Sequence, residues 1–86
     1  MKLFHRTSEA AAEAIIATRS WRSKENTAEV YFSTVLNGQT DGYGDAAIAV
    51  DVPEVVANLD DEFPDGEQHF RVSVADLEGR EVTRER

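Results

Sequence analysis

The sequence predicts an α+β fold, with a mainly antiparallel sheet of three to five strands, one amino-terminal helix and one short helix. Three observations support this prediction. An alanine-rich segment near the start has apolar residues at helical spacing, three later segments repeat apolar residues with a period of two, and glycine or proline stands between them. Because 86 residues suffice for one modest core, we expect a single domain over residues 1–86.

The amino-terminal part of the chain predicts a strand, a helix and a loop. Lys2–Arg6 is a short strand candidate with an aromatic residue at its centre, and Ser8 offers a helix-capping hydroxyl two residues later. Ser8–Thr18 predicts the helix, because its apolar residues share one helical face: Ala11, Ala12, Ile15 and Ile16. The polar stretch Arg19–Asn26 predicts a loop, with Trp21 as its aromatic anchor.

Three later segments predict strands, because inward-facing positions recur in them with a period of two and they contain many β-branched and aromatic side chains: Thr27–Leu36, Ala46–Val52 and Glu67–Val74. The first two are separated by a glycine-rich loop over residues 37–45. The third follows Asp60–Gly66, whose composition predicts a turn.

Shorter elements complete the prediction. Pro53 ends the second of these strands or opens a helical turn, and an apolar stripe follows it: Val55, Val56 and Leu59. Ala75–Glu78 predicts a helical turn that Gly79 ends, and Val82 predicts a last edge strand.

The charge of the chain is strongly segregated. The formal net charge is −8, but residues 1–24 carry five Lys or Arg against two Glu, whereas residues 25–69 carry eleven Asp or Glu and no Lys or Arg. Residues 70–86 carry four charges of each sign. Such a field attracts a basic partner, although a solvated acidic surface without a partner is the plain alternative.

The charge pattern favours a small acidic, non-enzymatic interaction protein. Its surface over residues 25–67 would occupy the phosphate-binding groove of a basic nucleic-acid-binding protein or complex, which is nucleic-acid mimicry. In size and charge the chain resembles phage-encoded inhibitors such as anti-CRISPR proteins, and an antitoxin-like partner of a basic toxin fits the same surface. We expect loop acids and two aromatic anchors to bind this partner: Asp41, Tyr43, Asp45, Asp60, Asp61, Glu62, Phe63, Asp65 and Glu67.

Several other functions are disfavoured by the residue pattern. The chain has no cysteine, and the acidic run fails the calcium-loop spacing because Phe63 stands at a ligand position, so we expect no metal site. His69, on the outward side of a strand, is expected to be an ordinary surface residue. Gly42-Tyr43-Gly44 lacks the remaining residues of a phosphate loop, and direct nucleic-acid binding needs clustered Lys or Arg.

The sequence shows no pattern of a signal peptide or of a membrane-spanning segment, and this predicts the cellular location of the protein. Residues 1–6 contain charge and a histidine where a signal peptide needs an apolar core, and no segment has the roughly 20 apolar residues of a membrane span. We therefore expect a cytoplasmic protein that does not contact membranes.

One resemblance covers much of the chain. Lys2–Thr7 with the alanine-rich helix after it, Val30–Thr34 and Gly42–Glu54 together resemble small bacterial domains with an ADP-ribosyltransferase-like fold. The resemblance implies an enzyme that uses NAD, in which a histidine orients the nicotinamide ribose, an aromatic residue stacks on the nicotinamide and a glutamate stabilises the oxocarbenium-like transition state. His5 and either Tyr31 or Tyr43 match the first two roles. The late strand carries no acid, so Glu67 at its start is the nearest candidate for the third role.

Overall fold

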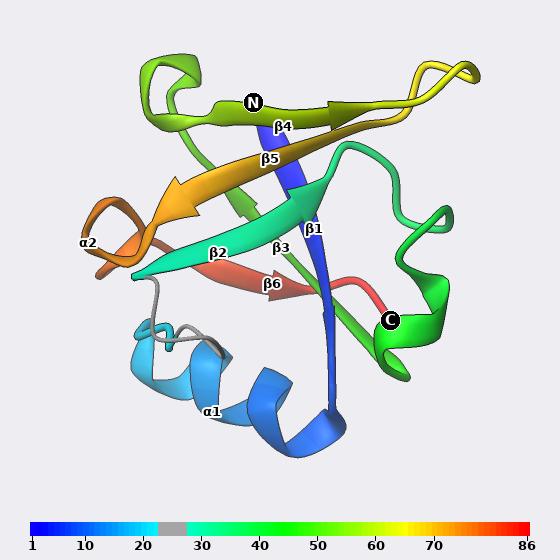
Figure 1. Ribbon diagram of the computed structural model, residues 1–86. Coiled ribbons are helices and arrows are strands. Elements are labelled where there is room, and N and C mark those ends of the chain that lie inside the picture. The colour runs from blue at the N-terminus through cyan, green and yellow to red at the C-terminus, as the bar shows by residue number, and fades with distance from the viewer. Residues whose placement is uncertain (23–27) are drawn as a thin grey trace.

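Six antiparallel strands form one sheet in the computed structural model, which describes residues 1–22 and 28–86 (Figure 1). The strand order is β4-β5-β2-β1-β3-β6. The strands are β1 (Lys2–Thr7), β2 (Glu29–Ser33), β3 (Ala46–Asp51), β4 (Asn58–Glu62), β5 (Gln68–Ser73) and β6 (Val82–Arg84). The helices are α1 (Glu9–Thr18) and α2 (Val74–Leu77), with short 3₁₀ turns η1 (Asp41–Tyr43) and η2 (Glu54–Val56). The predicted α+β class is confirmed, with one strand more than the expected maximum of five.

The predicted amino-terminal helix is confirmed, together with its cap. The Ser8 hydroxyl accepts a hydrogen bond from the Ala11 N–H at 3.2 Å, so Ser8 precedes α1 as its N-cap. At the other end Arg19 adopts a left-handed conformation with φ of 55°, and its N–H donates to the Ile15 carbonyl at 2.8 Å. The loop predicted after this helix lies partly outside the described residues.

Strand β4 replaces the first half of the predicted turn at Asp60–Gly66. Its sequence, Asn-Leu-Asp-Asp-Glu, has neither alternation nor a buried face, and all five residues are exposed. Backbone pairing to β5 holds this edge strand, with an irregularity between Leu59 and Asp61. Carboxylates along an edge strand disfavour pairing with other copies of the chain, so the composition that suggests a turn also suits an edge. The predicted apolar stripe does not form, since Val55 and Leu59 are exposed.

The sheet is divided between β1 and β2. β1 pairs with β3 from Lys2↔Asp51 to Thr7↔Ala46, and β2 pairs with β5 along its whole length, but β1 and β2 share only the pair Phe4↔Ser33. Beyond this pair the two strands diverge, and Figure 1 shows β1 crossing β2 at a steep angle. The sheet therefore consists of two three-stranded halves, β4-β5-β2 and β1-β3-β6, with an opening between them.

The core lies on the face of the sheet that α1 and Trp21 cover. Trp21, the predicted aromatic anchor, is buried, and its ring lies 5.3 Å from that of Phe32 and 5.4 Å from that of His5. The largest buried apolar side chains on the strands and α2 are Leu3, Phe32, Ile48, Val50, Val72 and Leu77. The aromatic cluster thus joins both halves of the sheet beside their opening.

Candidate functional site

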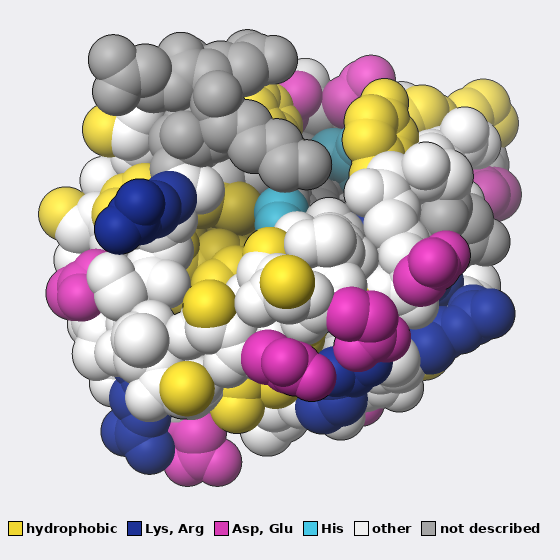
Figure 2. Space-filling model, turned by 90° about the horizontal axis from the view of Figure 1, so that it is seen from below, with side chains coloured by type: hydrophobic (Ala, Val, Ile, Leu, Met, Phe, Trp, Pro, Cys, Tyr) yellow, Lys and Arg dark blue, Asp and Glu magenta, His cyan; other side chains and the backbone are white. Residues whose placement is uncertain are grey.

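A groove of about 1140 Å³ lies where β1 and β2 diverge. Its walls come from β1, α1, the segment after α1, β2, the loop around η1, and the hairpin of β4 and β5. Figure 2 shows histidine side chains at the bottom of a hollow on this face, next to apolar side chains. This volume is slightly above the roughly 300–1,000 Å³ that is typical of small-molecule sites, so the groove has room for such a ligand. It is the leading candidate site among the described residues.

His5 crosses the opening from β1 to β2. Its Nδ1 lies 2.9 Å from the Tyr31 carbonyl oxygen, and because a carbonyl only accepts, Nδ1 is the protonated nitrogen. The ring also packs at a steep angle against Trp21 and lies 5.6 Å from Phe32. These contacts hold the imidazole in one orientation at the wall of the groove.

Trp21 contributes a buried donor to the same wall. The residue is 3% exposed, and its indole Nε1 has no hydrogen-bond acceptor among the described residues. Buried N–H groups are nearly always paired with protein, water or ligand.

Glu67 and His69 form a short pair at the other side of the groove. The buried Glu67 carboxylate accepts hydrogen bonds from His69 Nε2 at 2.6 Å, from the Ser33 hydroxyl at 2.9 Å and from the Gln39 N–H at 3.1 Å. Burial by itself raises the pKa of Glu67, but the hydrogen bonds from His69, Gln39 and Ser33 together lower it below the usual value. A side chain at Gly38 would collide with this carboxylate, so glycine lets the loop close over it.

The structure brings together three of the residues that the resemblance singles out. His5, Tyr31 and Tyr43 all line the groove, and Tyr31 and Tyr43 are exposed. Glu67 does not line the groove, and its carboxylate is connected to it through the hydrogen bonds from His69 and Gln39, which do line it. The three hydrogen bonds of Glu67 hold it beneath the groove wall, which differs from the exposed acid that the sequence predicts.

The remaining predicted binding residues fall into two regions. Four acids are exposed on one edge of the sheet, in β4 and the turn after it: Asp60, Asp61, Glu62 and Asp65. Asp45 is exposed before β3 in the other half of the sheet, and Asp41 begins η1. Phe63, an expected anchor, is half-buried with its ring 4.7 Å from that of His69. Glu25, the first acid of the segment, lies outside the described residues.

Arg71 interrupts the acidic region. Its Nε lies 3.8 Å from a carboxylate oxygen of Glu29 and 3.9 Å from one of Asp60. The acids are therefore gathered along the β4 edge and are not continuous over the whole segment.

His69 is a candidate site residue that the sequence does not predict. The sequence predicts an ordinary surface histidine, but its side chain is 18% exposed, lines the groove and contacts Glu67. The spacing of Glu67 and His69 does indicate this contact, because residues i and i+2 of a strand point to the same face. Ser33 and Gln39, the other partners of Glu67, lie about 30 positions away in the chain, and no local pattern indicates them.

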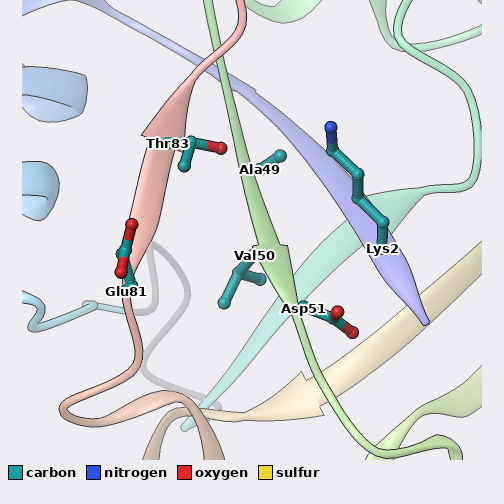
Figure 3. A pocket seen from close by; sticks show the side chains of 6 residues that line it. All are labelled: Lys2, Ala49, Val50, Asp51, Glu81 and Thr83. Atoms are coloured by element: carbon teal, nitrogen blue, oxygen red, sulfur yellow. The ribbon is translucent and has the colours of Figure 1, made fainter.

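A smaller hollow of about 340 Å³ lies across β1, β3 and β6. Figure 3 shows Lys2 and Glu81 on opposite sides of β3, so these charged groups do not converge. Lys2 is instead paired with Glu85 at 2.7 Å. Within the described part of the chain, no group of three or more His, Asp or Glu residues is arranged to hold a metal ion.

Comparisons with protein-family models, with curated proteins and with solved structures found no match. Over residues 1–22 and 28–86, no helix is long and apolar enough to cross a membrane. The function proposed below therefore rests on the residues of the groove and of the β4 edge.

Proposed function

We propose that this protein binds NAD in the groove between its two half-sheets, as a nucleotide-binding domain of the ADP-ribosyltransferase-like kind. One observation carries the proposal. His5 and Tyr31, which the sequence resemblance assigns to the nicotinamide side of the ligand, line the same groove, and the His5 ring is hydrogen-bonded at 2.9 Å to the backbone carbonyl of Tyr31 across its opening.

The chemistry of the walls suits both ends of this ligand. Tyr31 and Tyr43 offer exposed aromatic faces for a planar base, and a ring cation such as nicotinamide gains further from an aromatic face. The carboxylates of Glu29 and Asp61 also favour the positively charged nicotinamide ring, whereas Arg22 lines the groove as a cation suited to the pyrophosphate.

We expect NAD to change the fluorescence of Trp21 saturably, because Trp21 is the single tryptophan of the sequence and lines the groove. Replacing Tyr31 by alanine removes one aromatic face and should weaken binding about 2- to 10-fold, as expected for the ~0.5–1.5 kcal/mol of an aromatic contact. Calorimetry measures the same Kd without interference from NAD absorbance. Leu59→Ala, on the exposed edge strand and outside the groove, is the control and should bind like the wild type.

ADP-ribose is the informative competitor, because it lacks nicotinamide. Weaker binding of ADP-ribose than of NAD supports a nicotinamide subsite beside His5. Absence of saturable binding up to about 1 mM NAD, the upper end of common KM values, would contradict the proposal.

A second candidate function is the binding of a basic nucleic-acid-binding protein or complex by nucleic-acid mimicry, as phage inhibitors do. It is favoured by the exposed carboxylates that follow one another along β4 and its turn: Asp60, Asp61, Glu62 and Asp65. β4 is also an edge strand, so its outer backbone groups are open to an extended segment of a partner. An antitoxin-like role toward a basic toxin would use the same edge.

We expect the tagged protein to capture basic nucleic-acid-binding proteins from a host lysate at low salt and to release them at high salt or on addition of duplex DNA. Converting Asp60, Asp61, Glu62 and Asp65 to their amides should abolish capture. A control variant with the same loss of charge, in which Glu13, Glu54, Asp76 and Glu81 become amides, should retain it. Capture that resists both salt and DNA, or that the edge variant retains, would argue against mimicry.

A further inference from the structure

We infer that His69 and Glu67 form a proton-transfer pair that acts on the ligand in the groove, with His69 as general base and Glu67 as its positioning residue. The inference rests on the proposed function, because it takes NAD as the ligand. It assigns to this chain a catalytic group that differs from the glutamate that the sequence resemblance implies.

The hydrogen bond between the two residues defines which nitrogen of His69 is basic. The pKa of Glu67 is lowered, so its carboxylate is ionised near neutral pH and only accepts. Nε2 of His69, 2.6 Å from Glu67 Oε2, therefore carries the proton, and Nδ1 is the basic nitrogen. Among the described residues, no group is hydrogen-bonded to Nδ1 of His69, and Phe63 holds the ring through an edge contact.

The position of His69 points to a role beyond holding the carboxylate. Ser33 and Gln39 also donate to the buried Glu67 carboxylate, so His69 is not its only donor. His69 is nevertheless partly exposed at the groove wall. A buried carboxylate that holds an imidazole toward a reaction site is the arrangement by which hydrolases orient a general base and stabilise its protonated form.

Asp61 adds a charge suited to the transition state. It is the direct cross-strand neighbour of His69 and lines the groove. A carboxylate near the reacting carbon stabilises the positive charge that develops when a glycosidic bond to a cationic leaving group breaks. The base and the stabilising charge thus stand side by side on β5 and β4.

The reaction that fits these groups is hydrolysis of NAD. The bond between the ribose C1′ and the nicotinamide nitrogen breaks, and its electron pair leaves with nicotinamide. The oxygen of a water molecule bonds to C1′ while His69 Nδ1 takes one of its protons and later releases it to solvent. The products are ADP-ribose, nicotinamide and one proton, so atoms and charge balance without another reactant.

The test measures NAD binding by calorimetry and nicotinamide release by chromatography on the same preparations. We expect the wild type to release nicotinamide, and His69→Gly to lower kcat about 10²- to 10⁴-fold, the usual contribution of a general base, with the Kd for NAD unchanged. Added imidazole should restore part of the lost rate, which a structural role for His69 would not produce. Glu67→Gln should lower kcat without changing Kd, whereas the exposed acid Glu54, changed to Gln, serves as the matched control with the wild-type rate.

The outcomes separate this inference from the proposed function. Binding of NAD without nicotinamide release, or a His69→Gly rate equal to that of the wild type, overturns the inference and leaves the binding proposal intact. Absence of NAD binding in the wild type overturns both. If circular dichroism shows that His69→Gly does not fold, His69→Gln, which retains an N–H donor for Glu67, takes its place: loss of turnover with retained binding supports the inference, and retained turnover overturns it.

Discussion

Replacing Phe32 by alanine is expected to lower the free energy of unfolding by about 3–5 kcal/mol, the usual cost of truncating a buried phenylalanine. Phe32 is 1% exposed, faces Phe70 across β2 and β5, and packs its ring against Trp21 and His5. The substitution leaves a cavity in the cluster that joins the two half-sheets. Since small domains are stabilised by only about 5–15 kcal/mol, much of the stability would be lost.

Urea unfolding followed by far-ultraviolet circular dichroism measures this effect. Trp21 fluorescence is a less direct probe here, because the indole touches the substituted ring. Tyr43→Ala is the control, because Tyr43 is 70% exposed and its removal should change stability by less than about 0.5 kcal/mol. A Phe32→Ala loss of the same small size would show that the aromatic cluster does not join the two halves.

Replacing Glu67 by leucine is expected to cost about 3 kcal/mol at pH 7, because buried donors lose their acceptor. This carboxylate accepts hydrogen bonds from the Gln39 N–H, the Ser33 hydroxyl and His69 Nε2. A leucine side chain has no acceptor for these donors. Urea midpoints of the wild type and the variant, measured at one pH, give the difference. Glu54→Leu, an exposed acid in η2, should have little effect.

The cost of Glu67→Leu should also depend on pH. Burial raises the pKa of Glu67, but hydrogen bonds from His69, Gln39 and Ser33 bring it below 4.5 in the folded state. The unfolded chain therefore binds the proton first as pH falls, so the stabilisation by this carboxylate is complete above the unfolded pKa and is lost as pH falls through the folded pKa. The difference between wild type and variant should shrink below about pH 4, and a difference that stays constant from pH 7 to pH 3 would contradict this account.

The groove brings together residues that are far apart in the sequence, and the local sequence around each of them does not predict their contacts. His5 and Tyr31 are separated by 26 positions, and Ser33 and Glu67 by 34. The resemblance to ADP-ribosyltransferase-like domains marks His5, Tyr31 and Glu67, but it does not indicate that Glu67 is hydrogen-bonded to His69. The pairing register of β2 with β5, which sets Ser33 opposite His69, brings these groups together.

Local sequence determines most of the individual elements of this protein. The alanine-rich helix after Ser8, the alternating strands β2 and β5, and the segregated charge all follow from side chains close together in the chain, because helix and strand preference depend on short-range spacing. The strand at β3 is also predicted, but its expected alternation is wrong, since residues 46–50 are buried on both faces of the sheet. Tertiary structure alone decides the rest. Pairing with β5 makes β4 a strand, a single shared pair between β1 and β2 opens the groove, and two distant donors, Ser33 and Gln39, help to hold Glu67 buried and ionised. These features depend on contacts between distant segments, which no local pattern contains.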